Sequence, residues 1–180
     1  FSPQRPPRLI WVKTPVPVAF MVQFNSIKRG IAMYKNILIA TDGSEVADRA
    51  VAHGVALAAD QKASVTFVSV TEMWSAVRMA ERARIGSPNP LGQYETAAAA
   101  AANAILARAE ETAKAAGVSC KSVHVADKHA AAGIVATAKD NGCDLIVMGS
   151  RGHRGLEKLL VGSRVQEVLV SSDVPVLVAH

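Results

Sequence analysis

The sequence predicts an α/β protein in which an open, Rossmann-like parallel sheet of five strands carries helices on both faces. Short apolar segments typical of strands alternate along the chain with longer segments of helical character. That order favours parallel strands joined by right-handed helical crossovers. The first such segment, residues 36–40, is apolar from its second residue onward, which indicates a strand buried on both faces. A chain of 180 residues is long enough for one domain with a substantial core and too short for two.

The first strand is followed by a predicted helix over 44–60 and a second strand over 65–70. Ser44 can cap this helix, and the acidic side chains of Glu45 and Asp48 suit its positive end. Apolar side chains recur on the helix face that should meet the sheet: Val51, Val55 and Ala58. The second strand is rich in β-branched residues, which strands favour.

An irregular connection is expected over 71–94, followed by a long alanine-rich helix over 95–116. Four residues would interrupt a regular element in the connection: Gly86, Pro88, Pro90 and Gly92. The connection is longer than a minimal one, and two roles are open for it: a lid over a site or a surface that binds a partner. The helix has apolar positions at Ile105 and Leu106 among charged residues, and Gly117 closes it.

The second half of the domain continues the alternation to the end of the sequence. Strands are expected over 119–125, 145–148 and 176–179, and helices over 129–139 and 163–171.

The first 32 residues differ in character from the rest of the chain. They contain five prolines, five basic residues and no acidic residue, and Pro15 and Pro17 interrupt their one apolar run. We therefore expect residues 1–32 to be a disordered or non-native extension, with an organellar transit peptide as the alternative. The domain itself is expected to span residues 33–180.

Composition argues against several classes of function. The net charge of +5 comes from the five basic residues of 1–32, so residues 33–180 carry equal numbers of acidic and basic side chains. The domain therefore lacks the excess of positive charge that is typical of a protein that binds nucleic acid. No segment approaches the roughly 20 apolar residues of a spanning helix, so we expect a soluble protein with no membrane partner. Cys120 and Cys143 match no zinc pattern and are expected to be small apolar side chains in a reducing compartment, the cytoplasm.

Two strand ends carry residues suited to ligand chemistry. In an open parallel sheet, ligands bind beyond the carboxyl ends of the strands, where the strand order reverses. The first strand leads into Asp42, and the fourth into a glycine-rich segment over 149–155, before Gly162 and Ser163 open the last helix. Glycines that allow close backbone approach, next to a helix start, would suit a phosphate. A loop that needs flexible turns is the other reading, because no Walker or dinucleotide motif is present and Ser163 with Gln166 also fits a capping box.

The glycine spacing resembles a known signature. Gly149, Gly152 and then Gly162-Ser163 are similar to the G-x2-G-x9-G-[ST] pattern of the ATP-binding branch of the universal stress protein family. Residues 34–44 and 174–178 resemble the start and the end of that family's domain. The resemblance covers residues 33–180 and leaves out the first 32.

That resemblance implies a strand order of 3-2-1-4-5 and an ATP site between the first and fourth strands. Asp42 would face the ribose or a phosphate-bound Mg²⁺, and the backbone of Val70 would meet the adenine. The start of the last helix would bind phosphates through backbone amides and the Ser163 hydroxyl. The residues expected to contact the nucleotide are Ala40, Thr41, Asp42, Val70, Met148, Gly149, Arg151, Gly152, Gly162, Ser163, Arg164 and Val165.

The resemblance also implies a homodimer. The last strand is short and apolar, with Pro175 near its start, and an exposed edge strand of this kind invites pairing with another chain. In the family it pairs with its twin across a two-fold axis, here through residues 175–179.

Three functions are open at this point. The first is an ATP-binding stress-response protein, a dimer in which nucleotide controls an unidentified protein partner. The second is an adaptor dimer of the same fold that binds no nucleotide. The third is a slow ATP hydrolase in which Asp42 binds magnesium or positions water. The sequence has no nucleophile-elbow motif and no histidine spacing typical of a metal site, so we expect the first and assign no catalytic residue.

Overall fold

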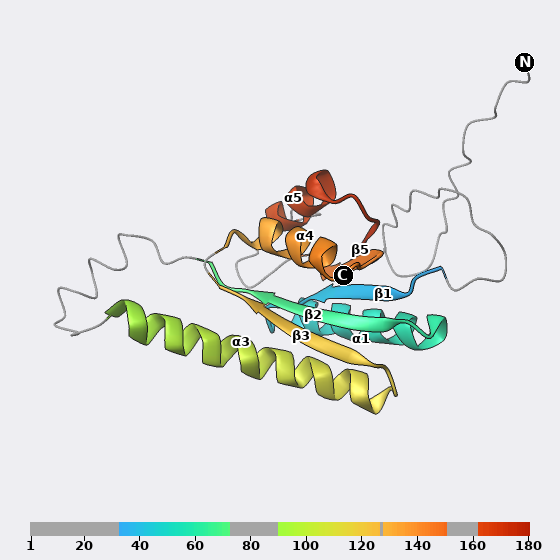
Figure 1. The fold of residues 1–180 in the computed structure, drawn as a ribbon, viewed down its shortest axis with the longest axis horizontal. Helices are drawn as coiled ribbons and strands as arrows, with labels where there is room; N and C mark the ends of the chain where they lie inside the picture. Colours follow the sequence, from blue (N-terminus) through green and yellow to red (C-terminus); the bar gives the residue numbers. More distant parts are fainter. Residues whose placement is uncertain (1–32, 73–89, 127, 151–161) are drawn as a thin grey trace, which may run out of the picture.

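The computed structural model describes residues 33–72, 90–126, 128–150 and 162–180, which form a domain around a five-stranded sheet (Figure 1). The strands are β1 (Asn36–Ala40), β2 (Ser64–Val70), β3 (Cys120–Val125), β4 (Leu145–Gly149) and β5 (Val176–Ala179). They lie in the order β3-β2-β1-β4-β5, and every neighbouring pair is parallel. The predicted strands, their direction and their order are confirmed.

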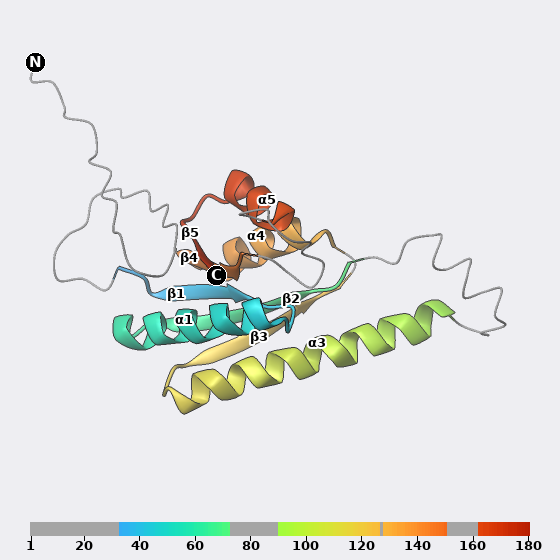
Figure 2. The ribbon, with the colours of Figure 1, turned by 180° about the vertical axis from the view of Figure 1, so that it is seen from behind.

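Helices cover both faces of the sheet, as expected. α1 (Glu45–Gln61) and α3 (Pro90–Ala115) pack on one face, while α4 (Ala130–Asp140) and α5 (Ser163–Ser171) pack on the other (Figures 1 and 2). β1 lies at the centre, between β2 and β4, with Ala40 opposite Val68 on one side and Met148 on the other. The ends of these three strands therefore lie next to one another.

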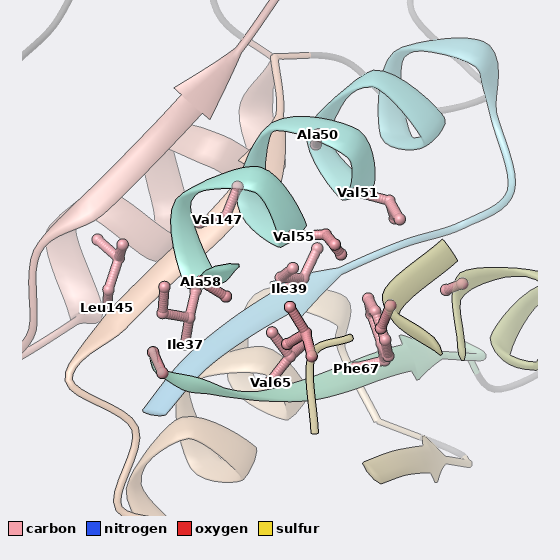
Figure 3. Close-up of a cluster of buried hydrophobic side chains, with 14 of the residues drawn as sticks. Ile37, Ile39, Ala50, Val51, Val55, Ala58, Val65, Phe67, Leu145 and Val147 are labelled. Carbon is pink, nitrogen blue, oxygen red and sulfur yellow. The ribbon is translucent and has the colours of Figure 1, made fainter. Parts of the chain in front are cut away.

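The core has two layers because alternate side chains of each strand point to opposite faces. On the side of α1 and α3, Ile37, Ile39 and Phe67 are fully buried and belong to one cluster with the predicted α1 residues Val51, Val55 and Ala58 (Figure 3). On the opposite side the cluster is formed by residues from β1, β2, β4, α4 and α5, among them Leu38, Val68, Ile134, Ile146, Val165 and Val168.

Asp144 joins the starts of the two central strands. Its Oδ2 accepts a hydrogen bond from the Lys35 amide at 2.8 Å, and its Oδ1 accepts one from the Asn36 amide at 3.2 Å. Beside this pair, burial and the Asp144 charge raise the pKa of Tyr34 above its usual value. The carboxylate thus fixes the register at which β1 enters between its neighbours.

The start of α3 was predicted wrongly. The helix begins at Pro90 and not at residue 95, so Pro90 and Gly92 do not interrupt it. Proline is favoured at the first position of a helix, because that position needs no amide donor and the fixed φ of proline suits a helix. The other described helix and strand ends agree with the prediction to within one residue. Residues 1–32, and 73–89 of the expected irregular connection, lie outside the described residues.

The two cysteines are free thiols in the described part of the chain. Cys143 is buried and Cys120 is half-buried. Burial raises the pKa of both thiols, which lowers the fraction of reactive thiolate near neutral pH. The buried Cys143 packs in the core on the side of α4 and α5, consistent with its expected role as a small apolar side chain. Among the described residues, no helix combines the length and the apolar character needed to span a bilayer.

We expect Gly54→Val to destabilise the domain by roughly 1–3 kcal/mol, a typical cost of overpacking a core. A Cβ atom at Gly54 would lie 2.5 Å from Ile39 Cδ1 and 3.0 Å from Ile39 Cγ1, so that the buried Ile39 side chain or α1 itself would have to shift. Ala52→Val on the exposed face of the same helix is the matched control. It should lower the free energy of unfolding by only about 0.6 kcal/mol, because valine has a lower helix propensity than alanine. Urea unfolding followed by circular dichroism measures both changes, and equal losses would contradict the close contact.

Candidate functional site

The turn after β1 is fixed by its own side chains. The amide of Thr41 extends the pairing with β2 by donating to the Val68 carbonyl at 2.9 Å. The Ser44 amide then donates to Asp42 Oδ1 at 3.0 Å, and the Ala47 amide donates to Ser44 Oγ at 3.3 Å. Ser44 is therefore the N-cap of α1, as predicted, and Asp42 is held at the carboxyl end of the central strand.

Gly43 is required in this turn for two reasons. Its φ of +76° lies in the left-handed region that glycine adopts readily. A Cβ atom there would also lie 2.8 Å from Ile105 Cγ1 of α3, so the backbone of the turn packs directly on that helix.

The end of β4 is closely packed as well. A Cβ atom at Gly149 would lie 3.1 Å from the backbone carbonyl of Val46, in the first turn of α1. The next residue, Ser150, is buried and donates its amide to the Ala179 carbonyl at 2.7 Å. Its own carbonyl accepts a hydrogen bond from the Gly162 amide at 2.9 Å, which seats the start of α5 against the end of β4.

The first turn of α5 has no side-chain cap. Gly162 is the N-cap residue, and its carbonyl accepts from the amides of Val165 at 3.0 Å and Gln166 at 3.2 Å. Ser163 is therefore the first helical residue, as predicted, and the alternative reading, a capping box with Ser163 at the N-cap, does not hold. No described residue accepts a hydrogen bond from the Ser163 or Arg164 amide, so both donors point out of the positive end of the helix.

The structure brings most of the predicted site residues to one edge of the sheet. Ala40 ends β1 and is followed by Thr41 and Asp42, and Val70 ends β2. Met148 and Gly149 end β4, and Gly162 caps α5, whose first residues are 163–165. Arg151 and Gly152 lie outside the described residues. The amide of Gly162 is used internally and Val165 is buried, so the exposed donors of this helix start are those of Ser163 and Arg164.

Sequence reasoning missed two residues that lie at the same edge. Glu72 and His129 both contact the side chain of Arg164. The only signal for Glu72 is that an acidic residue stands two positions after a predicted strand, and no local pattern marks His129. Among the described residues, no group of three or more histidine, cysteine, aspartate or glutamate side chains is arranged to hold a metal ion.

Comparison with known proteins gives a consistent result. A model of the Universal stress protein family matches residues 33–180. The chain is 31% identical over 152 residues to universal stress protein MJ0531 of Methanocaldococcus jannaschii, a match that covers 84% of this chain and 85% of that protein. It is 29% identical over 149 residues to universal stress protein YxiE of Bacillus subtilis, covering 82% of this chain and all of that protein.

Solved structures show the same similarity in three dimensions. The protein MJ0577 of M. jannaschii superposes with a TM-score of 0.68 at 27% identity, covering 82% of this chain and 96% of that one. A universal stress protein in complex with cAMP superposes with a TM-score of 0.57 at 26% identity, covering 82% of this chain and 97% of that one.

We expect Ser44→Ala to destabilise the domain by about 1 kcal/mol, the usual cost of losing an N-cap oxygen. The Ala47 amide would lose its acceptor in a buried position. Ser119→Ala, at an exposed serine before β3, is the control and should leave the unfolding midpoint unchanged. Thermal unfolding of the three proteins measures the effect, and equal midpoints for all three would show that the cap contributes nothing.

Proposed function

The chain belongs to the universal stress protein family, and on that premise we propose that it binds an adenine nucleotide, ATP, at the carboxyl edge of its sheet. In this proposal the protein acts in the stress response as a homodimer whose bound nucleotide regulates an unidentified protein partner. The observation that carries the proposal is the uncapped start of α5, where two amides face outward from a positive helix end.

The position of this helix start supports a phosphate as its ligand. α5 begins beside the end of β4, through the Gly162–Ser150 hydrogen bond, and β4 lies next to β1 with its Asp42. A ligand between β1 and β4 would therefore meet a carboxylate, strand ends and helix amides together, as at the switch point of other open parallel sheets. The structural neighbour crystallised with cAMP supports a nucleotide as the class of ligand.

The described residues fit such a ligand in distinct ways. A side chain at Gly149 would crowd Val46, and one at Gly43 would clash with Ile105 of α3, so glycine at both positions leaves backbone atoms at the ends of these strands. We assign the adenine to the backbone of Val70, the ribose or a phosphate-bound Mg²⁺ to Asp42, and the phosphates to Ser163 and Arg164. Mg²⁺ prefers carboxylate, water and phosphate oxygens, and Asp42 offers it a carboxylate oxygen.

We expect Ser163→Pro to weaken ATP binding by about tenfold, the scale of one hydrogen bond to a charged group. Proline removes the Ser163 amide but is accepted at the first position of a helix. Gly162, with φ −66° and ψ 152°, already has the extended backbone that a following proline requires. Isothermal titration calorimetry with ATP measures the change.

Ser163→Ala is the matched control, because it keeps the amide and removes only the hydroxyl. The proposal requires proline to reduce affinity more than alanine does. Equal affinities for the proline and wild-type proteins would exclude the Ser163 amide as a phosphate donor. Absence of ATP binding by the wild-type protein would exclude the proposed function itself.

The outer edge of β5 pairs with no other described strand, and this edge supports the proposed dimer. The Ile146 amide donates to the Pro175 carbonyl and the Ser150 amide to the Ala179 carbonyl, so the odd-numbered residues of this strand face β4. By the two-residue period of a strand, the backbone groups of Val176 and Val178 face away from the sheet. They are available to pair with a second copy.

We expect Val178→Pro to convert the dimer to a monomer while the domain remains folded. The substitution removes an outward amide and none of the bonds to β4, and proline is tolerated in that position of an edge strand. Analytical ultracentrifugation measures the mass, with Val170→Ala on the exposed surface of α5 as the control. A Val178→Pro protein that still sediments as a dimer would place the interface elsewhere.

A further inference from the structure

The side chain of Arg164 crosses the carboxyl edge of the sheet and ends among charged groups from other elements. Its Nη2 donates to Oε1 of Glu72, the second residue after β2. Its Nη1 lies against Nε2 of His129, the N-cap residue of α4, and 3.5 Å from Oε2 of Glu167 on α5 itself. One guanidinium is therefore shared by two carboxylates and an imidazole.

Glu72 is held in place by its own surroundings. The preceding Thr71 donates its amide to the Val125 carbonyl at 2.9 Å, and its Oγ1 lies 3.0 Å from His124 Nε2. The Glu72 carbonyl accepts a hydrogen bond from the Tyr94 hydroxyl of α3 at 3.4 Å. Contacts from β3 and α3 therefore fix the residue whose carboxylate meets Arg164.

The guanidinium lies near the same helix end as the two outward amides. Side chains on a helix tilt toward its N-terminus, and Arg164 is in the first turn of α5. A cation at the positive end of a helix is unfavourable on its own, so the Glu72 carboxylate offsets a local repulsion. The side chains of Arg164 and Glu72 are 40% and 34% exposed, which leaves the ion pair open to a ligand from solvent.

Among the described side chains of this cluster, carboxylates outnumber the guanidinium, which disfavours an additional anion beside them. Glu72 and Glu167 together carry one more charge than Arg164 can neutralise. The imidazole of His129 lies against both groups, with its Nε2 at Arg164 Nη1 and its Nδ1 3.3 Å from Glu167 Oε2. A phosphate at the α5 amides would lie beside the carboxylates of Glu72 and Glu167 unless one of them moved away from Arg164.

We propose that Glu72 is an internal competitor for the phosphate site: it binds Arg164 when no nucleotide is present and is exchanged for a phosphate oxygen when one binds. This inference rests on the proposed nucleotide function and names how that site is regulated. The exchange keeps one anion on Arg164 and returns the Glu72 carboxylate to water. Glu72 thereby lowers the affinity of the site for ligands that carry phosphates and leaves its affinity for a nucleoside unchanged.

Glu72→Gln tests this directly on the full chain, with ATP and adenosine as probes in calorimetry. We expect ATP to bind about threefold to fivefold more tightly, the scale of one half-exposed ion pair, and adenosine to bind unchanged. Glu110→Gln removes the same charge from an ion pair with Lys114 on α3 and should leave both affinities unchanged. If Glu72→Gln left ATP affinity unchanged or lowered it, Glu72 would not be a competitor.

A double-mutant cycle separates competition from a general change in charge. Arg164→Gln should weaken ATP binding, and adding Glu72→Gln to it should have no further effect, because the competitor acts only through Arg164. An equal gain from Glu72→Gln with and without Arg164 would overturn the proposal. Glu72→Asp, which keeps the charge on a shorter side chain, should give a smaller gain than glutamine and is a second test should the glutamine variant fold poorly.

The outcomes also distinguish this inference from the proposed function. ATP binding by the wild-type protein with no response to Glu72→Gln would remove the competitor and leave the nucleotide site. Absence of ATP binding by the wild-type, Glu72→Gln and Glu72→Asp proteins would remove both.

Discussion

The parallel pairing of β1 on both sides is the constraint on which the rest of the molecule depends. A central strand with neighbours on either edge and helices on either face must be apolar on both sides, and Ile37, Leu38 and Ile39 are completely buried. The polar residues of β1 and of the segments that flank it in the sequence, Asn36 and the turn over 41–44, consequently lie at its ends. Asp144 binds the amides at the amino end, and the side chains of Asp42 and Ser44 bind the amides at the carboxyl end. The polar side chains of β1 and its flanking turns that could contact a ligand therefore lie at its ends, because its middle residues are apolar and buried.

The same close packing explains why glycine occurs at critical contacts. Gly54 lets α1 lie directly on Ile39, and Gly149 lets the end of β4 lie against the backbone of Val46. Both contacts involve α1, which therefore acts as the reference against which the ends of β1 and β4 are aligned. A site composed mainly of backbone groups needs this kind of support, since it has few side chains that could adjust to a displaced helix.

The sequence allowed the helices and strands to be predicted, because apolar runs, caps and glycines are local signals, and the same signals led to the candidate site at the carboxyl edge of the sheet. The strand order needed a family resemblance, since periodicity does not say which strands are neighbours. Local rules failed at the start of α3, because Pro90, which elsewhere interrupts a helix, occupies the first position of this one. At α5 the predicted start at Ser163 is confirmed, and the alternative that Ser163 is the N-cap is not, because Gly162 takes that place. The contact between Glu72 and Arg164 spans 92 positions and leaves no trace in the local sequence.

The position of β1 between β2 and β4 also has a consequence for synthesis on the ribosome. Ile37 pairs with Leu145, so the first strand to emerge keeps one edge open until most of the domain has been translated. β1 and β2 can associate early, but the nascent sheet then displays an apolar, unpaired edge over a long interval. We therefore expect completion of the sheet to be a late, non-local event, and chaperones that shield strand edges to matter most in that interval.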